Sequence, residues 1–331
     1  MDDRCFKGTI LKSLYIPKYV SLMNANIESP EPLKTIECDE SNEFFTSVNG
    51  ILYTKDKKSL VFFPRNYSKS FTTPDFNEKI VYYAFGLSLI ESITFTQNVK
   101  AIDTYAFIGT KIKSLILPPT INLNGFGQFQ DCRSLNEITI EDGVTIISSI
   151  CFFGTNISNI VFPKRLKNIV LHAFANCQNL LAVTIPSSVS FLGGRCFSSH
   201  TNVTFEEGSP FSQDDQGLVF GSGKYLSLCL SEKESYTIPE YVEIIFSDVF
   251  AANNILKTII FDGDSKLKTI QNSAFENCKN LTNIIFPNSL VEILIRAFMG
   301  CTSLRTIKFG NNLNMIYTDA FYNCITLEFL D

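Results

Sequence analysis

The dipeptide Ala-Phe, or a variant with Cys, Gln or Val in place of Ala, recurs at nearly constant spacing along this chain of 331 residues. Successive phenylalanines are 22 or 23 residues apart from Phe85 to Phe197, and 23 or 25 apart from Phe250 to Phe321. The dipeptides end at Phe6, Phe85, Phe107, Phe129, Phe152, Phe174, Phe197, Phe250, Phe275, Phe298 and Phe321. A fixed period in this range indicates a repeat architecture, in which each unit buries its apolar face only by stacking on its neighbours.

Each unit carries the same pattern around its phenylalanine. A Leu-x-x-Ile-x-Phe run, as in Leu281–Phe286, contains a period-two apolar pair and predicts a short strand. Pro287 and its counterparts end that strand, because proline cannot donate to a sheet ladder. A Val-x-x-Ile segment then leads to the next Ala-Phe, where Ala fits a tight corner and Phe fills the coil. We expect a β-rich, curved, right-handed solenoid of about 12 repeats with a parallel sheet on its concave side. Adjacent strands of a parallel sheet lie about 4.8 Å apart, so a dozen coils would span roughly 55–60 Å.

Two places break this period in the same way. Residues 36, 44 and 50 have the spacing of residues 203, 211 and 217, and each set precedes a strand–turn–strand pattern. The turns are Lys55–Lys58 and Gly221–Lys224, and we interpret both segments as β-hairpin insertions. The interpretation divides one domain, 1–331, into N-terminal repeats 1–38, a hairpin insertion 39–76, central repeats 77–206, a second hairpin insertion 207–240 and C-terminal repeats 241–331.

The combined pattern, Leu-x-x-Ile-x-apolar-Pro-x-x-Val-x-x-Ile-x-x-x-Ala-Phe-x-x-Cys, resembles the BspA-like leucine-rich repeats, also called the treponemal type. Asn49–Tyr53, followed by Leu60 and Pro64, matches that family as well. The resemblance covers essentially the whole chain and implies a leucine-rich-repeat fold. Members of the family occur on surfaces of oral bacteria and mucosal parasitic protists. The resemblance therefore implies a cell-surface or secreted adhesin or surface antigen in host–pathogen interaction, with a host extracellular-matrix or cell-surface protein as ligand.

Composition limits the other partners. The net charge is −5 and no basic block is present, which argues against a nucleic-acid partner. No stretch approaches the length of apolar residues that a membrane span needs. The segment Met1–Phe6 lacks the apolar region of a classical secretory signal, so a cytoplasmic leucine-rich-repeat scaffold stays open as an alternative. The sequence begins with little capping segment and stops one strand into a coil, so we expect either a continuing chain or end-to-end self-association.

The ten cysteines follow the repeat rather than a metal motif. Five of them stand three residues after the phenylalanine, where other repeats hold Thr, Ser, Asn or His200, which predicts a buried polar column. Cys5, Cys151 and Cys196 take the place of the corner alanine, and we expect small buried thiols there. No pair has the spacing of a zinc site, so we predict no metal and no cofactor. The column cysteines are Cys132, Cys177, Cys278, Cys301 and Cys324.

No arrangement of residues predicts catalysis. We expect His200 to be a hydrogen-bonded core residue and His172 to lie on the surface. Neither histidine can be assigned to a Cys-His or Ser-His-Asp arrangement. Gly221–Lys224 has a phosphate-loop composition but lacks the required glycine spacing and the Ser or Thr after the lysine. We therefore predict no enzyme and no catalytic residue. Asn66, in the sequon Asn66-Tyr67-Ser68, is the candidate for glycosylation if the chain enters the secretory path.

The strand pattern also predicts a surface. The residue between the last two apolar positions of each strand points outward, because side chains alternate across a strand. For an exposed column these residues are unusually apolar and nearly uncharged. Strand propensity alone would favour β-branched residues there, but solenoids commonly bind ligands through such a face, and we predict protein binding through it. The column consists of Tyr15, Thr94, Ile116, Thr139, Val161, Thr184, Thr204, Ile260, Ile285 and Lys308.

Overall fold

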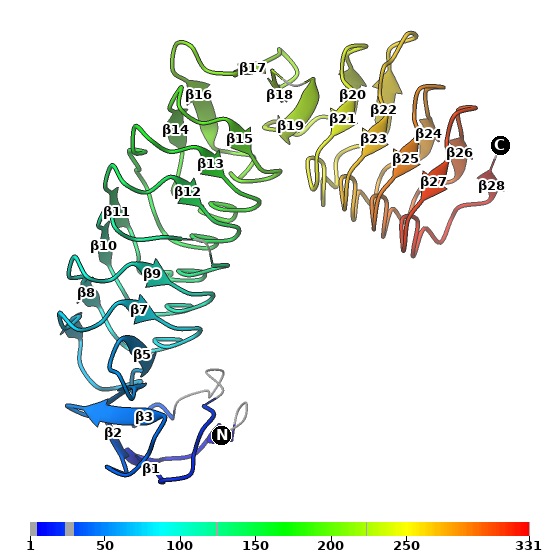
Figure 1. Ribbon diagram of the computed structural model, residues 1–331. Helices are drawn as coiled ribbons and strands as arrows, with labels where there is room; N and C mark the ends of the chain where they lie inside the picture. Colours follow the sequence, from blue (N-terminus) through cyan, green and yellow to red (C-terminus); the bar gives the residue numbers. More distant parts are fainter. Residues whose placement is uncertain (1–4, 24–29, 124, 223, 331) are drawn as a thin grey trace. The chain divides into compact units, whose positions relative to one another are not determined.

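The computed structural model describes residues 5–23, 30–123, 125–222 and 224–330. The chain is a β-solenoid of about 13 turns, and no helix occurs in these ranges. It divides into two compact units, Met1–Val189 and Ser190–Asp331, which we call the first and the second unit. In each, short strands repeat coil after coil (Figure 1). The predicted leucine-rich-repeat solenoid is confirmed.

The strands are two to five residues long. Those of the first unit are β1 (Ser13–Ile16), β2 (Thr35–Cys38), β3 (Phe45–Val48), β4 (Ile51–Thr54), β5 (Ser59–Phe62), β6 (Ser70–Thr72), β7 (Lys79–Ile80), β8 (Ser92–Thr94), β9 (Ala101–Ile102), β10 (Ser114–Leu117), β11 (Glu137–Ile140), β12 (Ile146–Ile147), β13 (Asn168–Ile169) and β14 (Ala182–Ile185).

The second unit repeats this arrangement. Its strands are β15 (Phe191–Leu192), β16 (Asn202–Phe205), β17 (Phe211–Gln213), β18 (Leu218–Gly221), β19 (Tyr225–Cys229), β20 (Ser235–Ile238), β21 (Ile244–Ile245), β22 (Thr258–Phe261), β23 (Thr269–Ile270), β24 (Asn283–Ile285), β25 (Glu292–Ile293), β26 (Thr306–Lys308), β27 (Met315–Ile316) and β28 (Phe329–Leu330).

Each coil contributes to two parallel sheets. The Leu-x-x-Ile-x-Phe segments form the sheet β6-β8-β10-β11 in the first unit and β20-β22-β24-β26-β28 in the second. The Val-x-x-Ile segments form two-residue strands that pair from coil to coil, such as β7 with β9 and β23 with β25. Burial alternates as the pattern predicts: in β10, Leu115 and Leu117 are buried while Ser114 and Ile116 are exposed.

The predicted corner phenylalanines form the centre of the core. Phe85, Phe107, Phe129, Phe152 and Phe174 are fully buried, and their rings stack at centroid distances of 4.6 to 5.5 Å. Stacked aromatic pairs contribute about 0.5–1.5 kcal/mol each beyond the apolar area they bury. In the second unit Phe250, Phe275, Phe298 and Phe321 stack in the same way, 4.9 to 5.2 Å apart.

In most coils the corner depends on two residues with left-handed backbone. One precedes the Ala of Ala-Phe, as Tyr105 does with φ 55°, and the other follows the Phe by two, as Gly109 does with φ 66°. Through this geometry the N–H groups of Tyr105, Phe107 and Gly109 all donate to the next coil, with N···O distances of 2.8 to 2.9 Å. The later position mostly holds Gly, Asn or Asp, which tolerate positive φ. The earlier one holds residues of any kind, including Ile150 at φ 59°.

Antiparallel strands occur at both breaks in the repeat. β3, β4 and β5 pair antiparallel in the first unit, and β17, β18 and β19 do so in the second. The last strand of each set then pairs parallel with the next coil, β5 with β7 and β19 with β21. These strands are therefore part of the stacked sheet, and the interpretation of 39–76 and 207–240 as insertions into an enlarged repeat is not confirmed.

The left-handed corner predicts that Ile150→Asn stabilises the protein. A β-branched residue is strained at φ 59°, and asparagine relieves a strain on the order of 1 kcal/mol. We expect the thermal unfolding midpoint to rise. Ile116→Asn, at an exposed isoleucine within β10, is the control and should not raise it. A lower midpoint for Ile150→Asn than for the control would contradict the prediction.

Candidate protein-binding face

The outward side chains of the longer strands form a surface in each unit. We define the display face as these side chains on β6, β8, β10 and β11 in the first unit, and on β20, β22, β24 and β26 in the second. Every residue of the predicted outward column is exposed. The sheet of the first unit holds Thr94, Ile116 and Thr139 together, and that of the second holds Ile260, Ile285 and Lys308 together.

Four predicted residues, Val161 among them, lie apart from these groups. Tyr15 is on β1, Thr184 is on β14 and Thr204 is on β16, outside the two sheets that define the display face. Val161 was expected on a strand, which is wrong: residues 158–163 form no strand. Its side chain is nevertheless 78% exposed. Without a ladder, its position is less fixed by the sheet than that of Ile116 or Ile285.

A second outward column was missed in the sequence. It lies two residues before the predicted one, and all of its members are exposed. The alternation of side chains along a strand was the signal that could have found it. These side chains are small and mostly uncharged, so the display face combines hydroxyl and amide groups with aliphatic ones. The column comprises Ser70, Ser92, Ser114, Glu137, Ser235, Thr258, Asn283 and Thr306.

Charged residues gather immediately before the strands and neutralise one another. Glu91 lies between Lys69 and Lys113, with N···O distances of 2.8 and 2.6 Å. The hydrogen bonds and positive charges of these two lysines lower the pKa of Glu91 to about 2. In the other sheet of the second unit, Lys224 and Lys268 hold Glu243 in the same way, at 2.9 and 2.7 Å. The part of the display face beside Lys69, Glu91 and Lys113 therefore carries little net charge.

The ladder of the first unit opens locally between β8 and β10. β6 pairs with β8 over three residues and β10 pairs with β11 over four, but β8 and β10 pair only at Ser92 and Ser114. A pocket of about 290 Å³ lies on the display face at this opening. Its lining includes Ser92, Thr94, Gln97, Ser114, Ile116, Pro118 and Glu141.

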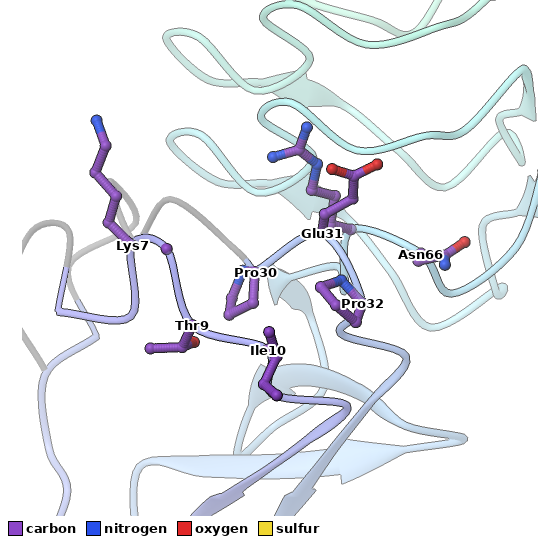
Figure 2. A pocket seen from close by; sticks show the side chains of 9 residues that line it. Lys7, Thr9, Ile10, Pro30, Glu31, Pro32 and Asn66 are labelled. Carbon is purple, nitrogen blue, oxygen red and sulfur yellow. The ribbon is translucent and has the colours of Figure 1, made fainter.

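A second pocket lies near the start of the chain. It has a volume of about 570 Å³, and Figure 2 shows Ile10, Pro30 and Pro32 close together with the Lys7 side chain extending away. Asn66, the predicted glycosylation acceptor, lines this pocket and is half-buried. Its backbone N–H donates to Leu33 at 2.9 Å. Glycosylation of Asn66 stays a prediction.

Four cysteines of the column are buried as predicted, and the fifth, Cys324, is half-buried. In each coil the thiol donates to the carbonyl oxygen of the phenylalanine in the preceding coil, at 3.0 to 3.2 Å. Burial raises the pKa of Cys132 and of Cys278 to about 12. Such thiols stay protonated and are poor nucleophiles. Their geometry therefore indicates a structural role.

Two expectations at these columns are wrong. Cys5 is exposed, because no described coil covers it on its outer side. His200 is also exposed. In its coil the buried hydrogen-bonding position falls one residue later, at Thr201, whose N–H donates to Ser198 at 3.0 Å. His172 is half-buried and has the left-handed backbone of the corner.

Two other kinds of feature are absent from the described ranges. No group of three or more His, Cys, Asp and Glu side chains there could hold a metal ion. No helix in the same ranges is both long and apolar enough to cross a membrane. Gly223, part of the segment with phosphate-loop composition, lies outside the described residues.

Comparison with known proteins identifies the repeat. The family model of the BspA type leucine rich repeat region matches in six copies, over residues 78–204 and 226–331. Because the match covers well over half of the chain, the protein belongs to the BspA-type leucine-rich-repeat family. A comparison with curated protein sequences finds no match.

Solved structures share the fold. A leucine-rich cell surface protein from Faecalibacterium prausnitzii has a TM-score of 0.55 at 18% identity, covering 98% of this chain and 88% of its own. The pneumococcal vaccine antigen PcpA has a TM-score of 0.52 at 21% identity, covering 87% of this chain and 76% of its own. At these identities the likeness establishes the solenoid fold alone.

The ion pairs of Glu243 predict a pH-dependent contribution to stability. The folded-state pKa of about 2 lies below the usual value near 4.3. The contribution is therefore complete above the unfolded-state pKa and is lost as the pH falls toward 2. We expect Glu243→Gln to lower the unfolding temperature at neutral pH and low salt, with a smaller difference at pH near 2 or in high salt. Glu137→Gln, at a carboxylate in no ion pair, is the control. If Glu243→Gln lowers the unfolding temperature by the same amount at every pH, the prediction is contradicted.

Proposed function

We propose that the protein is a non-catalytic binding module that acts as an adhesin or surface antigen. In this proposal it is exposed at the cell surface or secreted, and it recognises a host matrix or cell-surface protein through the display face. The observation that carries the proposal is the exposure of isoleucine side chains on hydrogen-bonded strands. Ile116 and Ile285 are 59% and 69% exposed although each lies within a strand that pairs with a neighbouring strand.

Such a surface suits protein recognition for physical reasons. Fully burying an isoleucine side chain contributes about 1.5–3 kcal/mol, and side chains on a hydrogen-bonded strand are already ordered before the partner arrives. The border charges of Glu91 with Lys69 and Lys113 are paired within the chain, so docking there requires no new partner for them. The small hydroxyl and amide groups of the second column can supply the polar contacts that orient a ligand.

The extracellular location rests on likeness. One structural neighbour is described as a cell surface protein and another as a vaccine antigen. Both share the solenoid over most of this chain. These descriptions support the surface assignment, which belongs to the proposal.

The location has a direct test. When intact cells that produce the protein are treated with a membrane-impermeant amine reagent, we expect labelling of its exposed lysines, such as Lys113, which is 65% exposed. A cytoplasmic protein made by the same cells is the control for lysis. If this protein is shielded as completely as the control, it is not an adhesin, and the intracellular scaffold replaces the proposal.

The binding face is tested by charge substitution. Ile116→Lys and Ile285→Lys, singly and together, should weaken capture by an immobilised panel of purified extracellular-matrix proteins at least about tenfold, which is 1.4 kcal/mol. The matched control is Ile295→Lys, at an isoleucine that is 43% exposed and lies outside the display face. Thermal unfolding of each variant verifies the fold. If Ile295→Lys weakens capture and the variants at Ile116 and Ile285 do not, the binding surface lies elsewhere on the chain.

A further inference from the structure

We propose that the pocket between β8 and β10 receives a lysine or arginine side chain of the protein partner. The proposal rests on the function proposed above and specifies the chemistry of the partner at one point of the display face. At about 290 Å³ the pocket is slightly smaller than typical small-molecule sites, which suits a single side chain.

Hydrogen bonds between the end of β8 and the coil before it fix the opening between β8 and β10. The N–H of Thr73, in the coil before, donates to the carbonyl of Thr94 at 3.0 Å. The Thr73 hydroxyl accepts from the N–H of Thr96 at 2.8 Å and contacts the Thr96 hydroxyl at 3.2 Å. Thr73 is buried. These three contacts hold the end of β8 toward β6, and β8 loses its pairing with β10 after Ser92.

The parting of the strands leaves backbone groups available. At comparable places the residue that follows the strand donates to the next coil, as Thr73 does to Thr94 in the coil before and Phe286 does to Lys308 in the second unit, at 3.0 and 2.9 Å. The corresponding bond from Phe95 to the carbonyl of Ile116 is not formed. The pocket therefore has a main-chain acceptor at its mouth in addition to its side chains.

The side chains of the pocket carry one uncompensated negative charge. Glu141 lines the pocket and forms no ion pair with any described residue, whereas Glu91, which directly precedes the pocket residue Ser92, is already paired twice. The hydroxyls of Ser92, Thr94 and Ser114 donate to no other described residue, and so they can orient toward a ligand. Ile116 and Pro118 provide an apolar wall.

This combination selects a basic side chain. Lysine and arginine place an aliphatic stem against apolar surface and keep the charged group at a polar edge, which matches Ile116 and Pro118 beside Glu141. A purely aliphatic side chain would desolvate the carboxylate and the hydroxyls without replacing their hydrogen bonds to water, at a cost in affinity. An acidic side chain would be repelled by Glu141. Charge complementarity therefore favours a cationic occupant.

The test uses short peptides of one design. We would titrate the isotopically labelled full chain with acetylated, amidated Ala-X-Ala peptides, where X is lysine, arginine, norleucine or glutamate, and follow the amide signals of Phe95 and Ile116. The lysine and arginine peptides should bind about tenfold more tightly than the norleucine peptide, and their binding should weaken in high salt. The glutamate peptide should leave the signals unchanged.

Glu141→Gln should reduce the affinity for the lysine peptide about fivefold or more, and should weaken capture of the matrix protein as well. For the peptide titration the matched control is Glu137→Gln, because Glu137 forms no ion pair with any described residue and does not line the pocket. Equal binding of the lysine and norleucine peptides, or an equal effect of the two variants, overturns the proposal. If Ile285→Lys abolishes capture while Glu141→Gln does not, the basic occupant is wrong and the proposed function stands. If neither changes capture, the display face is not the binding surface.

Discussion

The stacked phenylalanines are the interaction on which the rest of the structure depends. A coil of 22 to 25 residues encloses too little apolar surface to fold alone, and its ring gains a partner only from the coils on either side. The rings lie 4.4 to 5.5 Å apart from Phe63 to Phe174, which is compatible with the spacing of hydrogen-bonded strands. Ring stacking and strand pairing therefore stabilise the same separation of coils.

The corner around each phenylalanine shows how the backbone accommodates this stack. In most coils two left-handed residues turn the chain so that its N–H groups point along the solenoid and pair with the next coil. The cysteine thiols donate along the same axis to the carbonyl of the preceding phenylalanine. The corner is thus held by backbone bonds in one direction and by side-chain bonds in the other. Strain at residues such as Ile150 is the cost of this arrangement.

The regular ladder also explains where a ligand could bind. Where strands pair fully, backbone groups are satisfied and only outward side chains are presented. Where β8 leaves β10, side chains meet in one pocket with the Ile116 carbonyl and the Glu141 carboxylate, neither of which has a partner among the described residues. Strand pairing is reduced in a similar way in the second unit. There β22, which carries Ile260, and β24, which carries Ile285, pair only at Thr258 and Asn283. In both units the exposed isoleucines of the display face lie beside a relaxed part of the sheet.

The amino-acid sequence alone determined the repeat, the solenoid class, the inward Phe, the buried cysteine column and the outward direction of residues such as Ile116 and Ile285. These follow from local patterns, because alternation along a strand and a fixed period specify which side chains face the core. Tertiary structure decided the rest. The left-handed residue before each Ala leaves no mark in composition, the buried position at His200 moved to Thr201, and residues 158–163 around Val161 formed no strand. The pocket beside Thr94 arises because Thr73 bonds the end of β8 more extensively than β10 does. That outcome depends on competition between coils some twenty residues apart in the chain, which no local pattern records.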